Sequence, residues 1–242
     1  MYEQISLQGK ATYVDDIPSP KDCLHGAFAY STKPLASVNC VRYESESHPD
    51  RVVSVVSYKD IPYGGKNVGA QTIFGKDLLF ADDLTRCAGE RIALVVASAC
   101  ALAAYKLRHP VRMCLSRKTD MIMTGGRHPM KITYSVGFIL NGKITALDLE
   151  ILINAGISED ISLIMPASIV NRLKKYDWGA LSLDIKLCKT NHTSKSAMRA
   201  PGVVQGTFIA EAVIEHVAST LWIDVDVAKD QNFHTFDNLT LF

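Results

Sequence analysis

Two runs of alternating hydrophobic and polar residues in the middle of the chain predict a β-hairpin. The runs cover residues 131–140 and 143–153, and Asn141-Gly142 lies between them. An Asn-Gly pair in this position favours a type I′ turn, because both central residues of that turn need a positive φ. We therefore expect two antiparallel strands joined by a tight turn at residues 141–142.

Helical spacing of apolar residues follows the hairpin in two places. Residues 205–220 place apolar side chains on one helix face, with Glu211 and Glu215 elsewhere on the surface of the helix. Residues 166–175 begin with a proline, which suits the first position of a helix, and continue with apolar residues at helical spacing. A third helix is predicted over residues 99–107, which are small and straight-chained.

The chain from residue 8 to residue 97 is rich in predicted strands. Residues 26–31, 51–58 and 92–96 are β-branched or aromatic stretches, and a further strand is predicted over residues 111–116. The strand over 92–96 runs into the next helix through Ala97-Ser98. This join has no Gly, Pro, Asn or Asp, although strand-to-helix connections normally carry such residues.

Composition and charge argue against a nucleic-acid-binding protein and against a membrane-spanning protein. The 242 residues are 48% hydrophobic, and 26 basic residues are offset by 25 acidic ones without a long basic run, which argues against a nucleic-acid partner. The longest uncharged run, over residues 92–105, falls short of the roughly 20 residues that a membrane span requires. No signal peptide is evident at the start, so we expect a cytoplasmic protein whose six cysteines are reduced.

For two candidate sites, a role in the fold is a better explanation than a role in binding a metal or an anion. Glu215 and His216 are adjacent on the predicted helix, but no second histidine lies four residues away, so we expect a helix-surface role and no metal site. The segment Gly125-Gly126-Arg127-His128-Pro129 could bind an anion through its backbone amides and arginine. The turn interpretation is favoured, because Gly-Gly is a common turn signal before a strand.

The segment 189–206 is more informative. It is a polar loop containing Arg199, a proline and a glycine, and it leads directly into the amphipathic helix over 205–220. The amides at a helix start, with an arginine just upstream, suit an anionic ligand. A rigid loop with a solvent-facing arginine explains the same residues equally well.

Longer motifs resemble the aldehyde oxidase and xanthine dehydrogenase family of molybdenum hydroxylases, and plant aldehyde oxidases most of all. The motifs that resemble its α/β hammerhead domain lie at residues 9–18, 26–36, 79–83 and 89–97. Those that resemble its first molybdopterin-binding domain lie at residues 117–121, 124–129, 187–191 and 198–206. Together they span nearly the whole chain.

The resemblance implies an α+β fold class. A hammerhead-like, β-rich α/β domain is expected over residues 1–97, followed by part of a molybdopterin-binding α/β domain over residues 98–242. The implied parent activity is oxidation of an aldehyde to a carboxylic acid, with water as the oxygen source and a molybdenum–molybdopterin cofactor. The iron–sulfur clusters and FAD of the full-length family belong to other domains and are not expected in this chain.

The resemblance also assigns individual residues. Arg199 matches the family arginine that lines the molybdenum site, so Arg199 and the adjacent Ala200 are the expected cofactor-binding residues. Pro201 stands where xanthine dehydrogenases have a substrate-stacking phenylalanine, and Ala167 stands where they have a purine-orienting arginine. Both departures favour aldehyde over purine substrates. No residue of this chain is assigned as catalytic or as a metal ligand.

Two parts of the family's cofactor site have no counterpart in this chain. The family has a long stretch, including a glycine-rich cofactor loop, where this chain joins Ala97 directly to Ser98, and the chain stops before the domain that supplies the catalytic glutamate. We therefore expect a fragment without activity of its own. The alternative is a non-catalytic module that forms a homodimer or pairs with a full-length paralogue. An internal deletion, a skipped exon and a faulty gene model all explain the join.

Overall fold

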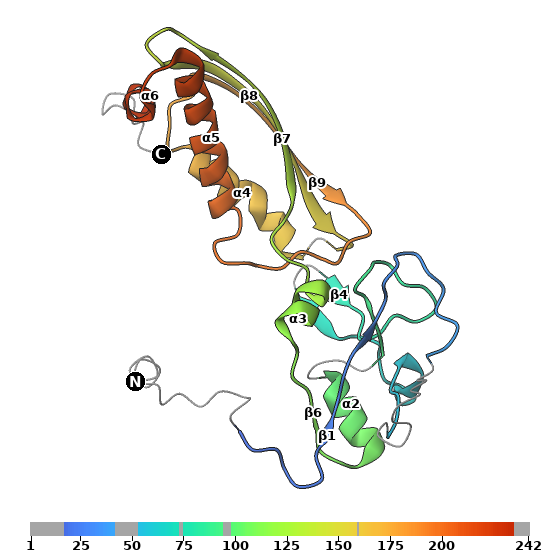
Figure 1. The fold of residues 1–242 in the computed structure, drawn as a ribbon. Helices are drawn as coiled ribbons and strands as arrows, with labels where there is room; N and C mark the ends of the chain where they lie inside the picture. The colour runs from blue at the N-terminus through green and yellow to red at the C-terminus, as the bar shows by residue number, and fades with distance from the viewer. Residues whose placement is uncertain (1–16, 42–52, 73–74, 94–97, 159, 235–242) are drawn as a thin grey trace. The chain divides into compact units, whose positions relative to one another are not determined.

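The computed structural model describes residues 17–41, 53–72, 75–93, 98–158 and 160–234. The chain forms two compact units (Figure 1). The first contains residues 1–71 and 76–123, and the second contains residues 72–75 and 124–242. Each unit has its own hydrophobic core.

The first unit consists of short strand pairs and helices around a small core. β1 (Leu24–His25) runs parallel to β6 (Val111–Arg112), and β2 (Ala29–Tyr30) runs antiparallel to β5 (Arg91–Ala93). β3 (Ala70–Thr72) pairs with β4 (Gly75–Asp77), although Thr72 and Gly75 are assigned to the second unit. The helices are η3 (Tyr58–Asp60), α2 (Ser98–Leu107) and α3 (Arg117–Met123). The buried core residues are Val56, Leu79, Phe80 and Ala103.

The strands of the first unit are shorter than the sequence predicted. The helix over 99–107 is confirmed as α2, whereas the strands over 26–31 and 111–116 are reduced to β2 and β6, of two residues each. β5 confirms the start of the strand over 92–96, and residues 94–97, with the join at Ala97, lie outside the described residues.

The strand predicted over residues 51–58 is wrong for the part that the structure describes. From residue 53 onward the segment makes one isolated bridge, between Ser57 and Ala93, and then turns into η3. The Asp60 carboxylate accepts a hydrogen bond from the Ser57 N–H at 2.8 Å. Local side-chain-to-backbone bonds of this kind compete with a strand ladder, so the β-branched sequence does not continue as a strand.

The second unit contains a three-stranded sheet in the order β7-β8-β9. β7 (Met130–Phe138) and β8 (Ile144–Gly156) are antiparallel, which confirms the predicted hairpin, and β9 (Ala180–Lys189) runs parallel to β8. β8 alternates buried and exposed residues over most of its length, because one sheet face packs on the core while the other meets solvent.

The predicted type I′ turn is wrong. Gly142 has a φ of 89°, but Asn141 is not among the described residues with a positive φ. The Ile139 N–H donates to the Lys143 carbonyl at 3.0 Å, which closes a three-residue loop that ends on the left-handed glycine. The Asn141 side chain accepts a hydrogen bond from the Lys143 N–H at 3.0 Å, and this Asx-type bond holds Asn141 in the ordinary φ region.

Helices cover one face of this sheet (Figure 1). They are η4 (Asp160–Ile164), α4 (Met165–Leu173), α5 (Val203–Leu221) and α6 (Val225–Asn232). α4 and α5 confirm the helices predicted over 166–175 and 205–220, and Pro166 lies in the first turn of α4 as expected. The core between helices and sheet is aliphatic, and Tyr176 and Trp178 close it with an edge-to-face contact.

The α+β fold class is confirmed, because mixed sheets and helices build both units. The compact units divide after Met123, and α2 and α3 belong to the first of them. The domain boundary between residues 97 and 98 remains a prediction, since residues 94–97 lie outside the described part of the chain. Among the helices that the structure describes, none combines the length and hydrophobicity needed to cross a membrane.

Candidate functional site

The polar loop between β9 and α5 lies against the start of β7 and the end of β8, all within the second unit. Two glycines permit this close approach. A Cβ atom at Gly156 would overlap the Thr193 carbonyl oxygen and come within 2.8 Å of Ser194 Cα, and a Cβ atom at Gly125 would overlap the Ser194 carbonyl oxygen. Both glycines also have a positive φ. Any side chain at either position would therefore push the loop away.

Backbone hydrogen bonds fix the course of the loop. The Thr190 N–H donates to the Gly156 carbonyl at 2.9 Å, and the Lys195 N–H donates to the Ala155 carbonyl at 3.3 Å. The Ser196 N–H donates to the Gly126 carbonyl at 3.2 Å. The loop is thus held by the backbone along most of its length before it reaches Arg199.

The structure brings together two segments that lie far apart in the sequence. The Arg127 guanidinium donates a hydrogen bond through Nη2 to the Arg199 carbonyl at 3.1 Å, across 72 positions of sequence. The Gly-Gly turn before β7 and the arginine loop before α5 therefore form one surface with two exposed arginines. A surface with two guanidinium groups suits an anionic ligand.

Arg199 and Ala200 belong to the loop just before α5. Arg199 is exposed, and its side chain makes no hydrogen bond or ion pair with the residues that the structure describes. Ala200 has a φ of 54°, in the left-handed region that costs a residue with a Cβ about 1–2 kcal/mol. Strain of this kind is often found at ligand-binding positions.

The beginning of α5 carries an unsatisfied donor. Gln205 accepts a hydrogen bond from the Gly202 N–H at 3.0 Å through Oε1, which caps the helix. Its Nε2 atom is buried and has no hydrogen-bond partner among the described residues, and the whole residue is 9% exposed. Buried amide groups normally have partners, so this nitrogen marks a place where an acceptor is missing.

Gln205 was not identified from the sequence as a site residue. A signal was present, because Gln205, Ile209 and Val213 share one face of α5 and all three are buried. A polar residue in the first turn of an otherwise apolar helix face needs a partner, and it can be recognised from the helical periodicity alone.

Next to the loop, His128 is part of the unit's interior and is not exposed for chemistry. It is 4% exposed and shares a hydrogen bond of 2.8 Å with Ser162 through Nε2. Burial, and secondarily the charge of Lys195, lower the pKa of His128 below its usual value. The imidazole is therefore neutral at neutral pH, and it anchors the turn that carries Arg127.

Glu215 and His216 lie on the exposed side of α5, as the sequence predicted. His216 shares a hydrogen bond of 2.8 Å with Tyr134 and contacts its ring edge-to-face. Within the described ranges there is no cluster of three or more His, Cys, Asp or Glu side chains that could hold a metal ion.

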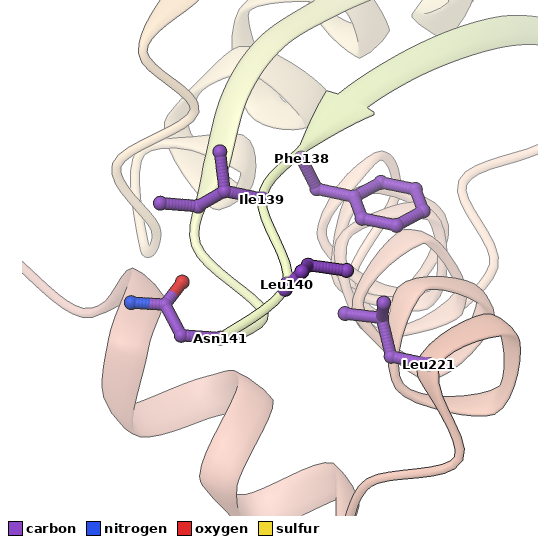
Figure 2. Close-up of a pocket in the computed structure, with 5 residues that line it drawn as sticks. All are labelled: Phe138, Ile139, Leu140, Asn141 and Leu221. Atoms are coloured by element: carbon purple, nitrogen blue, oxygen red, sulfur yellow. The ribbon is translucent and has the colours of Figure 1, made fainter.

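An apolar hollow of the second unit lies away from the arginine surface. It is lined by Phe138, Ile139, Leu140, Asn141 and Leu221, and the side chains of Leu140 and Leu221 point toward each other (Figure 2). Leu221 is the last residue of α5, whereas the arginine loop precedes its first residue. Nineteen residues of helix span about 28 Å, so the hollow is not part of the candidate site.

Two family models match the chain. One, described as a molybdopterin cofactor-binding domain, matches residues 89–233. The other, described as the a/b hammerhead domain of aldehyde oxidase and xanthine dehydrogenase, matches residues 8–109. The candidate site lies entirely within the first match, and the two matches overlap across the join at residues 97–98.

Curated relatives are similar along the whole chain. The abscisic-aldehyde oxidase of Arabidopsis thaliana is 37% identical over 381 positions, which cover 98% of this chain and 29% of the relative. The indole-3-acetaldehyde oxidase of Zea mays is 36% identical over 382 positions, which cover 99% and 28%. The chain spans less than a third of these relatives. Because it has 242 residues, well over a hundred aligned positions of each relative have no counterpart in it.

Solved structures share the fold. Quinoline 2-oxidoreductase from Pseudomonas putida 86 matches with a TM-score of 0.72 and 13% identity, over 98% of this chain and 50% of that chain. CO dehydrogenase from Oligotropha carboxidovorans matches with a TM-score of 0.75 and 13% identity over the same shares. The fold and the matched family models lead to one conclusion: the chain belongs to the aldehyde oxidase and xanthine dehydrogenase family and carries parts of its hammerhead and molybdopterin cofactor-binding domains.

Proposed function

We propose that the chain is the cofactor-facing part of a molybdenum-dependent aldehyde oxidase and that it has no aldehyde-oxidising activity by itself. The parent reaction converts an aldehyde and water to a carboxylic acid, and a bound molybdenum–molybdopterin group supplies its redox chemistry. One observation carries the proposal: Arg199 and Ala200 lie on the surface where the Gly-Gly turn and the start of α5 meet, in a chain of this family.

The donors on this surface fit an anionic pterin cofactor. Arg199 is exposed without a partner among the described residues, and the buried Nε2 atom of Gln205 lacks an acceptor. Phosphate and oxo groups are acceptors that guanidinium and amide donors bind well. Arg199 and the backbone at Ala200 would hold the group, and Gln205 would keep the beginning of α5 capped beside it.

The remaining residues of the site orient this loop. Gly125 and Gly156 let the loop pack on the sheet, and Arg127 holds the carbonyl of Arg199 in place. Charge stabilisation at a reacting centre depends on groups fixed before the substrate arrives. These contacts supply such rigidity for one side of the cofactor site.

The other side is what we propose to be missing. The relatives have well over a hundred positions without a counterpart here, and we place them between residues 97 and 98, where strand and helix join without a turn residue. This join also separates the proposed domains, 1–97 and 98–242. A site that has lost one wall cannot hold the reacting groups in productive geometry.

Turnover measurements test the proposal. The chain is expressed in a host that makes the molybdenum cofactor, purified, and assayed with an aldehyde and a redox dye as electron acceptor. We expect no oxidation above the background of a heat-treated sample. Turnover that depends on Arg199 would refute the absence of activity. Such turnover would be lost in Arg199→Met and retained in the control Arg117→Met on α3.

One observation favours a second candidate function, a non-catalytic module that pairs with another chain of the same fold. The outer edge of β9 has no partner strand in the described part of the chain. An unpaired strand edge is a template for pairing between chains. This function needs neither the cofactor nor the missing wall.

A further inference from the structure

The loop that joins β7 and β8 contains the only Asn-Gly pair of the sequence, Asn141-Gly142. Asn141 is exposed, whereas Gly142 is buried. A backbone nitrogen reaches a neighbouring side-chain amide carbon most easily when it belongs to glycine, because glycine has no Cβ to block the approach. Every other asparagine of the sequence precedes a residue with a side chain. The loop therefore carries an amide that can react with its own backbone.

Hydrogen bonds inside the loop act on both reacting groups. The Gly142 N–H donates to the Ile139 carbonyl at 2.9 Å, so the nitrogen that would attack is held by another partner. The Asn141 Oδ1 atom accepts a hydrogen bond from the Lys143 N–H at 3.0 Å. This bond polarises the amide carbon and stabilises the negative charge that grows on Oδ1 during an attack. The amide is thus activated, and the reaction requires the Gly142 nitrogen to leave the Ile139 carbonyl.

α6 holds this loop through the side chain of Asn232, which is fully buried. Its Nδ2 atom donates to the Gly142 carbonyl at 2.8 Å and to the Ala228 carbonyl at 2.8 Å. Its Oδ1 atom accepts a hydrogen bond from the Ile144 N–H at 2.8 Å. A single side chain of α6 therefore fixes both the loop and the first residue of β8.

We propose that Asn141 is a site of spontaneous deamidation, that the bonds of Asn232 to the loop limit its rate, and that the isoaspartate product loosens α6. The Gly142 nitrogen bonds to Asn141 Cγ, the Cγ–Nδ2 bond breaks, and ammonia leaves with the proton of the Gly142 N–H. A water molecule then opens the resulting cyclic imide at either of its carbonyls, which gives aspartate or isoaspartate. No group is oxidised or reduced. The inference is independent of the proposed cofactor site.

The two products differ in their effect on the loop. Aspartate keeps the length of the backbone and an oxygen that accepts from the Lys143 N–H. Isoaspartate routes the backbone through Cβ, which lengthens a three-residue loop by a carbon atom and moves the Gly142 carbonyl away from Asn232. A buried amide that loses its acceptor destabilises the folded state. Isoaspartate at position 141 therefore weakens the attachment of α6 to the loop.

Deamidation rates test the role of Asn232. Wild-type chain, Asn232→Ala and the control Asp230→Ala, at an exposed position of the same helix, are incubated in mildly alkaline buffer. Conversion at position 141 is followed by mass spectrometry of tryptic peptides, with Asn141→Gln as the blank. We expect Asn232→Ala to react about tenfold faster than wild type, because the loop opens more often without its buried hydrogen bonds. Asp230→Ala should react at the wild-type rate.

The wild-type chain in urea provides a second comparison that needs no variant to fold. Its rate should exceed the rate of the folded wild type, because the Gly142 nitrogen is then free of the Ile139 carbonyl. Far-UV circular dichroism establishes which variants are folded. Equal rates in folded and urea-unfolded wild type, equal rates in folded Asn232→Ala and wild type, or no conversion of Asn141 in the folded chain would overturn the proposal.

The stability of the product tests the effect on α6. Ion exchange isolates the deamidated chains by their added negative charge, and peptide mapping identifies the fractions rich in isoaspartate. Asn141→Asp is the matched control, because it carries the same charge on a backbone of normal length. We expect Asn141→Asp to unfold at the same urea concentration as wild type and the isoaspartate fraction to unfold at a lower one. Equal midpoints for the isoaspartate fraction and Asn141→Asp would overturn this part of the proposal.

Discussion

The close approach of the polar loop to β8 predicts that Gly156 is required for the stability of the second unit. In Gly156→Ala the new methyl group would overlap the Thr193 carbonyl and lie within 2.8 Å of Ser194 Cα, both backbone atoms. The positive φ costs about 1–2 kcal/mol, and overpacking against a fixed neighbour costs about 1–3 kcal/mol more. We expect the free energy of unfolding to fall by about 3 kcal/mol.

Gly142 provides the matched control in the same unit. Its φ of 89° resembles the 79° of Gly156, but the nearest atom to a Cβ there is the end of the flexible Ile223 side chain, at 2.8 Å. Gly142→Ala therefore carries the cost of the backbone conformation without a backbone clash. We expect a loss of about 1–2 kcal/mol, clearly less than for Gly156→Ala.

Urea unfolding followed by tryptophan fluorescence measures both variants. The two tryptophans, Trp178 and Trp222, both belong to the second unit, so the signal reports on that unit. Trp178 is 4% exposed and will respond strongly to unfolding. Equal destabilisation of Gly156→Ala and Gly142→Ala would refute the argument that the loop packs tightly on β8.

Three further predictions concern other residues. Burial, and secondarily the charge of Glu90, raise the pKa of Cys87 to about 11. At pH 8 a thiol reagent should therefore modify the exposed Cys40 and Cys114 and leave Cys87 unmodified until the protein unfolds. Labelling is measured by mass spectrometry of tryptic peptides, and labelling of Cys87 in the folded protein would contradict this prediction. The lowered pKa of His128 means that the folded state favours the neutral imidazole, so its contribution to stability is present above about pH 6.5 and is lost as the pH falls. Between about pH 7.5 and 5, the urea midpoint of His128→Gln should therefore depend less on pH than the midpoint of the wild type. The same pH dependence in both proteins would contradict the burial argument. Ala200→Gly should relieve the strain of the left-handed backbone conformation and stabilise the second unit by up to about 1 kcal/mol. A clear loss of stability in the same fluorescence assay would show that Ala200 is not strained.

Elements with strong local signals could be predicted from the sequence. The alternating runs around Asn141-Gly142 gave the β7–β8 hairpin, and helical spacing gave α4 and α5. The turn type could not be predicted from the Asn-Gly pair, because the Asn141 side chain bonds locally and shifts the loop to three residues. The strand over 51–58 failed for a similar reason, a local bond from Ser57 to Asp60.

The candidate site depends on contacts that sequence patterns do not encode. Arg199 was identified by resemblance, but its link to Arg127 requires the fold to bring together positions 72 residues apart. Gly156 is the last residue of β8, beyond the predicted strand over 143–153, and becomes recognisable only when Thr193 packs against it. Local propensity describes each element, whereas close approach between loops is set by the tertiary arrangement.

The ratio of molybdenum to protein tests the central claim most directly. We propose that this chain keeps the Arg199 surface but has lost one wall of the cofactor site. Purified from a host that makes the cofactor and passed through gel filtration, the chain should contain far less than one molybdenum per polypeptide by elemental analysis. One tightly held molybdenum per chain would contradict the account.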